Sequence, residues 1–222
     1  MGWWIIAIVI SLLVIMGYIG NKHSQVDWGG AIINMLDGWM RLLCRRVHKL
    51  SPDIVINLPK TGAAIVVANH VSGLDPFLLM TASRRPLRFL IAREEYERPI
   101  LHWLFKAGGC IPVDRTGRPE LALRQALKAL QAGEVLALFP HGKIHLDNDP
   151  PRKLKGGVAR LSAWTQTAIY PVRIDGIKAE GSVALAPFIP SDIVLTMTAP
   201  IQCQKNTMKE CLSLLEQAIS KI

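Results

Sequence analysis

The feature that most constrains this chain is an uncharged apolar run near its N-terminus. Residues 3–19 (WWIIAIVISLLVIMGYI) contain 17 residues without a charged side chain, which is at the short end of the length that spans a bilayer as a helix. Trp3, Trp4 and Tyr18 lie near its two ends, where interfacial aromatic residues gather. The run lacks the basic n-region and the small-residue cleavage site of a secretory signal. A retained membrane anchor is therefore predicted over the alternative of a cleaved signal.

Positive charge follows the apolar run. Lys22 and His23 come directly after it, and Arg41, Arg45, Arg46 and Lys49 follow further on. Because positively charged flanks stay on the cytoplasmic side, everything after residue 20 is predicted to lie there, which in a bacterium is the inner face of the inner membrane.

A second, amphipathic helix is predicted over the same basic stretch. Its apolar residues recur at three- to four-residue spacing: Ile32, Ile33, Leu36, Met40, Leu43 and Val47. This stripe either lies along an anionic leaflet or packs on the globular domain, and both alternatives stay open. The two helices together can also form a hairpin that dips into one leaflet without spanning it.

The overall charge favours an anionic partner. Lys and Arg number 26 against 17 Asp and Glu, for a formal net charge of +9. Nucleic acid, an anionic lipid surface and a phosphorylated substrate all fit that charge. The apolar N-terminus favours lipid, and few aromatic residues interleave with the basic ones, so a nucleic-acid partner is not expected.

Four cysteines, Cys44, Cys110, Cys203 and Cys211, show neither C-x-x-C spacing nor a Cys/His cluster typical of zinc sites. No metal site is therefore predicted. Reduced thiols in a cytosol-facing domain are expected, because a disulfide framework is unusual at this length. Cys110 is a conceivable nucleophile, but no base lies near it in sequence, so a buried core cysteine is favoured.

From residue 61 onward, short β-branched runs alternate with helical stretches. This alternation predicts an α/β fold with a mixed, largely parallel central sheet flanked by helices. A membrane anchor with its amphipathic helix is predicted for residues 1–50, and the α/β domain for residues 51–222. Predicted strands cover 63–68, 87–93, 109–113, 135–139, 168–174 and 192–198, and predicted helices cover 76–84, 98–107, 119–131, 154–166 and 207–222.

A histidine and an aspartate stand at a predicted strand–turn–helix junction. In VVANHVSGLDPFLL a strand ends at Asn69, and Asp75 is expected to cap a helix that Pro76 begins. When the turn folds back, the Asp75 carboxylate can reach a ring nitrogen of His70. An imidazole, whose ordinary pKa is about 6.5, can then take the proton of an attacking hydroxyl while the carboxylate fixes its tautomer. The pattern alone also allows a simple helix cap beside a loop histidine.

Four further segments extend this motif into a family resemblance. Asn69 to Asp75 resembles the NHxxxxD motif of the glycerolipid acyltransferases, a family similar to the 1-acylglycerol-3-phosphate (lysophosphatidate) acyltransferases of bacterial membranes. Residues 109–115 (GCIPVDR), 139–143 (FPHGK), 155–159 (KGGVA) and 169–172 (IYPV) resemble later blocks of that family in the same order. The match covers about residues 60–180.

The resemblance implies an acyltransferase. The acyl group would pass from acyl-CoA or acyl-carrier protein to a lysophospholipid hydroxyl, with 1-acylglycerol-3-phosphate as the favoured acceptor and phosphatidate as its product. No covalent acyl-enzyme and no cofactor besides the donor are implied. The implied residues are His70 and Asp75 for catalysis, Arg115, Gly142, Lys143 and Lys155 for the acceptor and its phosphate, and Asn69 and His141 as additional candidates.

The third block departs from the family's FPEGTR. His141 replaces its glutamate, and Lys143 and Ile144 replace its threonine and arginine. Lys143 restores a positive charge but not the bidentate fork that arginine makes with phosphate. The family pattern assigns no role to His145. Another lysolipid or lipid alcohol is therefore a second hypothesis for the acceptor. A basic membrane-binding module without catalysis is a third, from a different functional class.

The basic residues also allow more than one interpretation. Arg115 can bind a phosphate, which is favoured, or pair with Asp114 or a helix terminus. Arg152, Lys153, Lys155 and Arg160 cluster after the third block without an acidic residue among them. A ligand-binding patch and a lipid-facing surface fit this cluster equally well.

Overall fold

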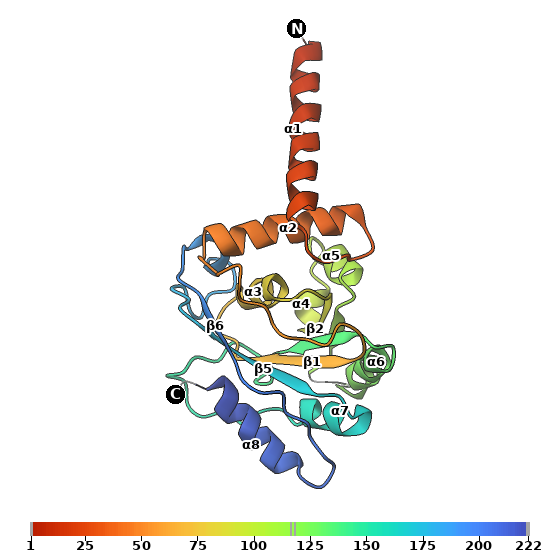
Figure 1. Cartoon of the computed structure of the whole chain (residues 1–222), viewed down its shortest axis with the longest axis vertical. Helices are drawn as coiled ribbons and strands as arrows, with labels where there is room; N and C mark the ends of the chain where they lie inside the picture. Colours follow the sequence, from red (N-terminus) through yellow and green to blue (C-terminus); the bar gives the residue numbers. More distant parts are fainter. Residues whose placement is uncertain (1, 116, 118, 221–222) are drawn as a thin grey trace.

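The computed structural model describes residues 2–115, 117 and 119–220, and it shows an α/β domain with a long helix projecting from one end (Figure 1). That helix, α1 (Gly2–His23), is exposed along nearly its whole length and is long and apolar enough to cross a bilayer. The second helix, α2 (Ala31–Arg46), lies across the top of the domain at the base of α1 (Figure 1). The N-terminal apolar helix suggests membrane association.

The central sheet has six strands in the order β3-β2-β4-β1-β5-β6. The first five strands pair in parallel, and β6 runs antiparallel to β5. This confirms the mixed, largely parallel sheet that the alternation of patterns predicted. The strands are β1 (Ala64–Ala68), β2 (Leu87–Ala92), β3 (Ile111–Val113), β4 (Val135–Leu138), β5 (Ile169–Asp175) and β6 (Val194–Met197).

Helices cover both faces of the sheet, with α3 beneath α2 on one face and α6, α7 and α8 on the other (Figure 1). The range predicted for α6 is observed unchanged, whereas only His102–Ala107 of the helix predicted over 98–107 is helical, and the separate helix α4 ends before Pro99, whose nitrogen cannot donate a backbone hydrogen bond. The remaining helices are α3 (Asp75–Ala82), α4 (Arg93–Tyr96), α5 (His102–Ala107), α6 (Pro119–Gln131), α7 (Gly157–Thr165) and α8 (Met208–Ile219), with a 3₁₀ turn at Ala186–Phe188.

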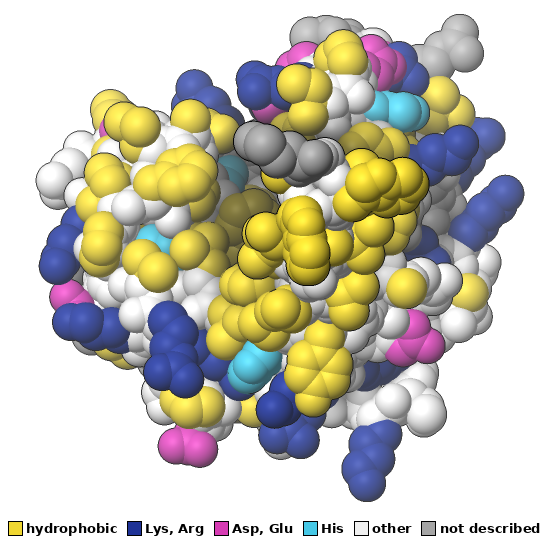
Figure 2. Space-filling view, turned by 90° about the horizontal axis from the view of Figure 1, so that it is seen from above, with side chains coloured by type: hydrophobic (Ala, Val, Ile, Leu, Met, Phe, Trp, Pro, Cys, Tyr) yellow, Lys and Arg dark blue, Asp and Glu magenta, His cyan; other side chains and the backbone are white. Residues whose placement is uncertain are grey.

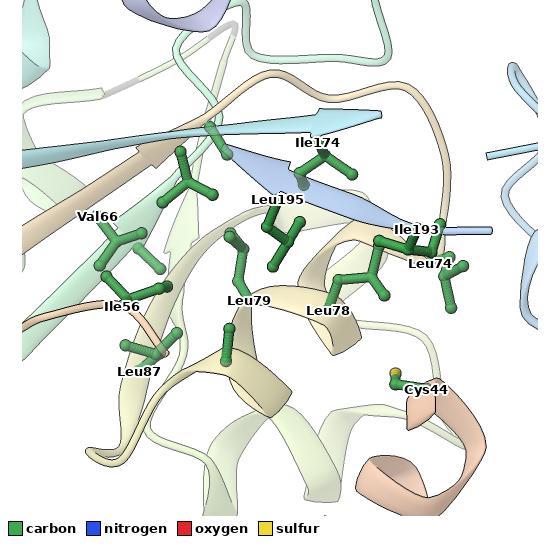
Figure 3. Packing of buried hydrophobic residues seen from close by; sticks show 14 of the residues in the cluster. Cys44, Ile56, Val66, Leu74, Leu78, Leu79, Leu87, Ile174, Ile193 and Leu195 are labelled. Carbon is green, nitrogen blue, oxygen red and sulfur yellow. The ribbon is translucent and has the colours of Figure 1, made fainter. Parts of the chain in front are cut away.

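Strand β1 is buried at every residue because it lies between these two helical layers. Successive side chains of a strand point to opposite faces, so Val66 joins the core beneath α3, while Ile65 and Val67 join the core against α6 and α7. Figure 3 shows the first of these cores, where Leu78 and Leu79 of α3 pack with residues of β1, β5 and β6. The end of β1, where the candidate site begins, is thereby fixed on both sides.

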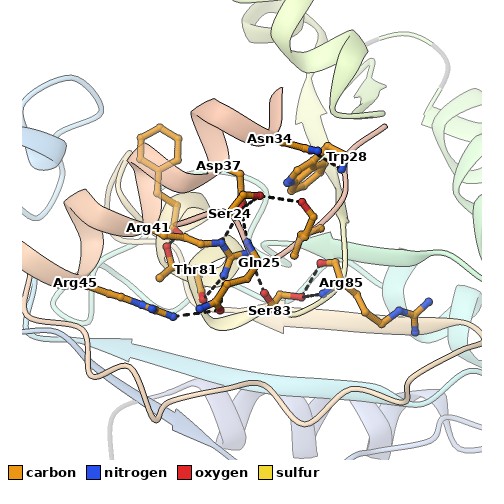
Figure 4. Close-up of polar contacts among 12 residues, drawn as sticks. Ser24, Gln25, Trp28, Asn34, Asp37, Arg41, Arg45, Thr81, Ser83 and Arg85 are labelled. Carbon is orange, nitrogen blue, oxygen red and sulfur yellow. Dashed lines mark hydrogen bonds and ion pairs between the residues drawn. The ribbon is translucent and has the colours of Figure 1, made fainter. Parts of the chain in front are cut away.

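Helix α2 docks on the domain through a buried ion pair. Arg41 bonds Asp37 within α2 at 2.7 Å, and its guanidinium also donates to Thr81 O at 2.8 Å and Ser83 O at 3.0 Å (Figure 4). These carbonyls lie at the C-terminal end of α3, where a positive charge is favourable. The apolar stripe is divided, with Met40 packed against the core and Ile32 exposed, so α2 packs on the domain and still presents part of its stripe outward.

The expectation of reduced thiols is wrong for one pair of cysteines. Cys203, in the segment after β6, forms a disulfide with Cys211 of α8. The first turns of α8 fold back on that segment and bring the two Cα atoms to 5.5 Å, within bridging distance. Cys44 and Cys110 are free, and both belong to or pack against the core beneath α3.

Candidate active site

The site begins where β1 ends, at the turn that holds the Asp75 carboxylate. The carboxylate is fully buried and accepts four hydrogen bonds from this turn. Oδ2 accepts from His70 Nδ1 at 2.7 Å, Val71 N at 2.7 Å and Ser72 N at 2.9 Å, and Oδ1 accepts from Ser72 Oγ at 2.8 Å. Helix α3 starts at Asp75 itself, with Leu74 at its N-cap and no side-chain cap bond. The expected capping role of Asp75 is therefore wrong, because the turn takes up its oxygens.

His70 presents one ring nitrogen to Asp75 and leaves the other available. The bond from Nδ1 fixes the tautomer, and the ring stacks on Phe139 with centroids 4.1 Å apart. Nε2 makes no hydrogen bond with any described residue, and the side chain is 19% exposed. The contact predicted between His70 and Asp75 is confirmed, and its geometry is that of an oriented general base.

The third block reaches this histidine because β4 lies beside β1. The two strands are parallel with Val67 opposite Leu138, so the residues that follow each strand meet at the same edge of the sheet. His145 N donates to His70 O at 2.7 Å, which ties the segment after β4 to the turn after β1. Phe139 was recognised in sequence only as part of a block, and its ring contact with His70 follows from strand order.

His141 of the third block and His145 just after it bring their rings into tilted contact beside the site. The rings of His141 and His145 lie 4.5 Å apart, and His141 Nδ1 is buried without a hydrogen-bond partner among the described residues. Burial lowers the pKa of His141 to about 4, with smaller contributions from His145, Arg152 and His70. The ring is therefore neutral near pH 7, where the family's glutamate would carry a negative charge.

Gly142 stands where a side chain would not fit. Its φ is +76°, in the left-handed region, and an added Cβ would lie 2.7 Å from Lys155 Cε and Nζ. The backbone of Lys155 donates to Pro140 O at 3.0 Å, which holds this lysine over the third block. Lys143 is exposed to solvent. The structure thus brings Gly142 and Lys155 together close to His141.

Two other predicted residues lie in different settings. Asn69 Nδ2 donates to Ile174 O at 2.9 Å and its Oδ1 accepts from Ile174 N at 2.7 Å, so the side chain joins the end of β1 to β5. Arg115 follows β3, three strands from β1, or about 14 Å along the sheet edge at the usual strand spacing. Its guanidinium lies 3.7 Å from the Glu94 carboxylate.

Neither free cysteine nor a metal cluster adds to this site. Burial raises the pKa of the Cys110 thiol to about 11, as expected for a core cysteine rather than a nucleophile. Within the described ranges, His, Cys, Asp and Glu side chains do not gather in groups of three or more that could hold a metal ion.

Comparisons with known proteins point to one family. Residues 54–175 match the family model described as Acyltransferase. An N-acylphosphatidylethanolamine synthase of Arabidopsis thaliana is 33% identical over 135 residues, which cover 54% of this chain and 48% of that protein. A probable 1-acyl-sn-glycerol-3-phosphate acyltransferase of Mycoplasma genitalium is 28% identical over 152 residues, covering 65% and 54%. The chain spans about half the length of the curated relatives it matches.

A solved structure shares the fold over almost the whole chain. The 1-acyl-sn-glycerophosphate (LPA) acyltransferase PlsC from Thermotoga maritima superimposes with a TM-score of 0.64 at 20% identity, covering 96% of this chain and 95% of that one. The arrangement of sheet and helices described above is therefore one that a solved protein already displays.

Proposed function

Because the chain belongs to the Acyltransferase family, whose model matches more than half of it, we propose that it transfers a fatty acyl group from acyl-CoA or acyl-carrier protein to a lysophospholipid. The favoured acceptor is 1-acylglycerol-3-phosphate, which becomes phosphatidate. This proposal rests on one observation above all, the bond between His70 Nδ1 and buried Asp75 that leaves Nε2 available.

The chemistry follows from the two ring nitrogens. Nε2 of His70 takes the proton of the acceptor hydroxyl while its oxygen attacks the thioester carbonyl, and the Asp75 carboxylate stabilises the imidazolium that forms. The new C–O bond stays when the tetrahedral intermediate collapses, the C–S bond breaks, and the proton passes from Nε2 to the leaving thiolate. No acyl-enzyme is needed, because a thioester is already an activated donor.

The acceptor's phosphate is assigned to the basic side chains on the same sheet edge. Lys155 lies over Gly142 beside the third block, Lys143 is exposed next to it, and Arg115 follows β3 further along that edge. A lipid acceptor also calls for a membrane location. We assign α1 as the anchor and the cytoplasmic leaflet of a bacterial inner membrane as the site of action, since basic residues follow α1.

A second acceptor class is favoured by the third block. His141 gives a neutral ring where the family has a carboxylate, and the family's arginine position holds Ile144. The name of the Arabidopsis relative refers to phosphatidylethanolamine acylated on nitrogen. The alternative is therefore the same base-assisted transfer to another lysolipid, a lipid alcohol or the amine of an ethanolamine lipid.

The test is thiol release by the purified full chain in mixed micelles. Acyl-CoA is supplied with lysophosphatidate, lysophosphatidylethanolamine, lysophosphatidylglycerol or phosphatidylethanolamine, and products are identified by mass spectrometry. We expect thiol release that depends on the acceptor and that His70→Ala abolishes. The control is His102→Ala, which replaces an exposed histidine of α5 and should leave thiol release intact. Activity retained in a folded His70→Ala variant refutes the mechanism. Absence of thiol release with every acceptor and donor refutes the enzyme and leaves the membrane-binding module.

A further inference from the structure

Two apolar segments of the α/β domain are exposed to solvent. In the first, which runs from residue 183 to 189, Leu185 is 62% and Phe188 78% exposed. In the second, at the start of α5, Ile100 is 82% and Trp103 51% exposed. Large apolar side chains that are exposed close together usually mark an interaction surface.

Both segments lie at the end of the domain from which α1 projects. The carbonyl of Pro187 accepts a hydrogen bond from His48 Nε2 at 3.0 Å, just after α2, and His48 O accepts from Ile193 N at 3.1 Å. Helix α5 lies directly beneath the other part of α2 (Figure 1). Figure 2, which looks down α1, shows the apolar side chains of this projecting helix, further apolar side chains across a hollow from them, and basic side chains around both groups.

The first segment is fixed to the catalytic turn. Gly73 N donates to Ser182 O at 3.0 Å, and Gly181 N donates to Val71 O at 2.8 Å. The backbone of Val183 approaches Gly73 so closely that a Cβ there would collide with its carbonyl. Ala186 is buried in the core while its neighbours point outward. The outward side chains are therefore held in a set position relative to His70.

We propose that these two segments, together with the outer side of α2, form a docking surface for an anionic lipid bilayer. The surface is continuous with α1, the apolar helix that suggests membrane association. Exposed Lys22, Arg46 and Lys106 lie on the same elements and complement an anionic leaflet. A tryptophan beside an aliphatic residue is typical of the bilayer interface.

Docking sets the depth of the active site. With Phe188 in the headgroup region, the hydrogen bonds of Gly73 to Ser182 and of Gly181 to Val71 hold the turn after β1 at a set distance from the leaflet that supplies the lysolipid. The inference extends the membrane location proposed above and does not depend on acyl transfer.

The experiment measures depth at single labelled positions in the full chain. Phe188→Cys, Leu185→Cys and Ile100→Cys are labelled with a thiol-reactive NBD dye. The free native thiols react slowly, because burial raises the pKa of Cys44 and of Cys110 to about 11. Each variant is reconstituted in phosphatidylcholine–phosphatidylglycerol vesicles that contain doxyl-labelled lipid. Leu214→Cys is the matched control, since Leu214 is 52% exposed on α8 at the far end of the domain.

We expect doxyl lipid to quench the dye severalfold more at positions 188, 185 and 100 than at 214, and aqueous iodide to show the opposite order. Equal quenching at all four positions overturns the docking surface. Energy transfer between labelled copies also overturns it, because it shows that a second chain covers these residues. Labelling at surface positions leaves the core unchanged, and a folded chain is verified by circular dichroism. Strong quenching together with absent thiol release sustains the surface while removing the proposed enzyme activity.

Discussion

Replacing Asp75 by asparagine tests the core of the proposed mechanism with the smallest change of shape. The amide keeps one oxygen, which can stay at the Oδ2 position and accept from His70 Nδ1, Val71 N and Ser72 N. Its NH₂ then faces Ser72 Oγ, which can accept in place of donating. The substitution therefore removes the negative charge and leaves the packing of the turn.

The expected magnitudes follow from that exchange. Three charge-assisted hydrogen bonds become neutral, each about 1 kcal/mol weaker, so we expect the free energy of unfolding to fall by about 3 kcal/mol. The imidazolium that forms during transfer loses its buried counterion, which costs about 3–5 kcal/mol. That cost lowers kcat by about 10²–10⁴-fold. KM stays nearly unchanged, because the charged pair exists only in the transition state.

The assay is steady-state thiol release with the best acceptor, combined with thermal unfolding in the same micelles. Ser72→Ala is the matched control, since it removes the Oγ bond to Oδ1 and the bond that Oγ accepts from Leu74 N, and leaves all three bonds to Oδ2. It should destabilise by about 1–2 kcal/mol and change kcat by less than about tenfold. A folded Asp75→Asn variant with kcat close to wild type, or with KM alone raised, refutes the assigned role of the carboxylate.

Three further outcomes follow from the structure. The pKa of His141 is about 4 in the folded chain and about 6.5 in the unfolded chain. Between pH 6.5 and pH 4 the unfolded state therefore binds more protons, so the free energy of unfolding should fall as the pH falls through this range. The loss is at most about 3 kcal/mol, and solvent screening of the partly exposed ring makes it smaller. His141→Gln should flatten this acid limb in pH-dependent melting, and His102→Gln should not. Gly142→Ala should lower Tm and acyl transfer together, because φ is +76° and the new methyl displaces Lys155; unchanged values contradict the geometry. Cys203→Ser should cost about 2.5 kcal/mol of stability for the short loop that its disulfide closes, and a reductant should produce the same loss in wild type but none in the variant.

The contact between His70 and Asp75 was predictable because its geometry is local. Asp75 is five positions after His70, and a turn between a strand and a helix is enough to bring their side chains together. Strand β1 was predictable for the same reason. Its run of β-branched and small apolar residues from 64 to 68 fits a strand that is buried on both faces. Only the assignment of Asp75 as a helix cap failed, because its carboxylate accepts four hydrogen bonds from the turn itself.

Contacts between distant segments were not predictable in this way. Arg41 was expected on a basic lipid-facing helix, yet it is buried against two carbonyls at the end of α3. The Cys203–Cys211 bridge likewise depends on how α8 folds back after β6. A helical pattern defines which residues share a face, but the element that this face meets depends on packing.

The sequence by itself determined the apolar N-terminal helix and the α/β class, because period and residue type act over a few neighbouring residues, and it favoured the pairing of His70 with Asp75 once the later blocks matched the family's order. Only the tertiary structure decided that Phe139 stacks on His70, that the third block reaches His70, and that Leu185 and Phe188 are exposed to solvent. These contacts join segments tens of residues apart. They exist because β4 pairs with β1 and not with another strand, and strand order follows from the packing of the whole sheet.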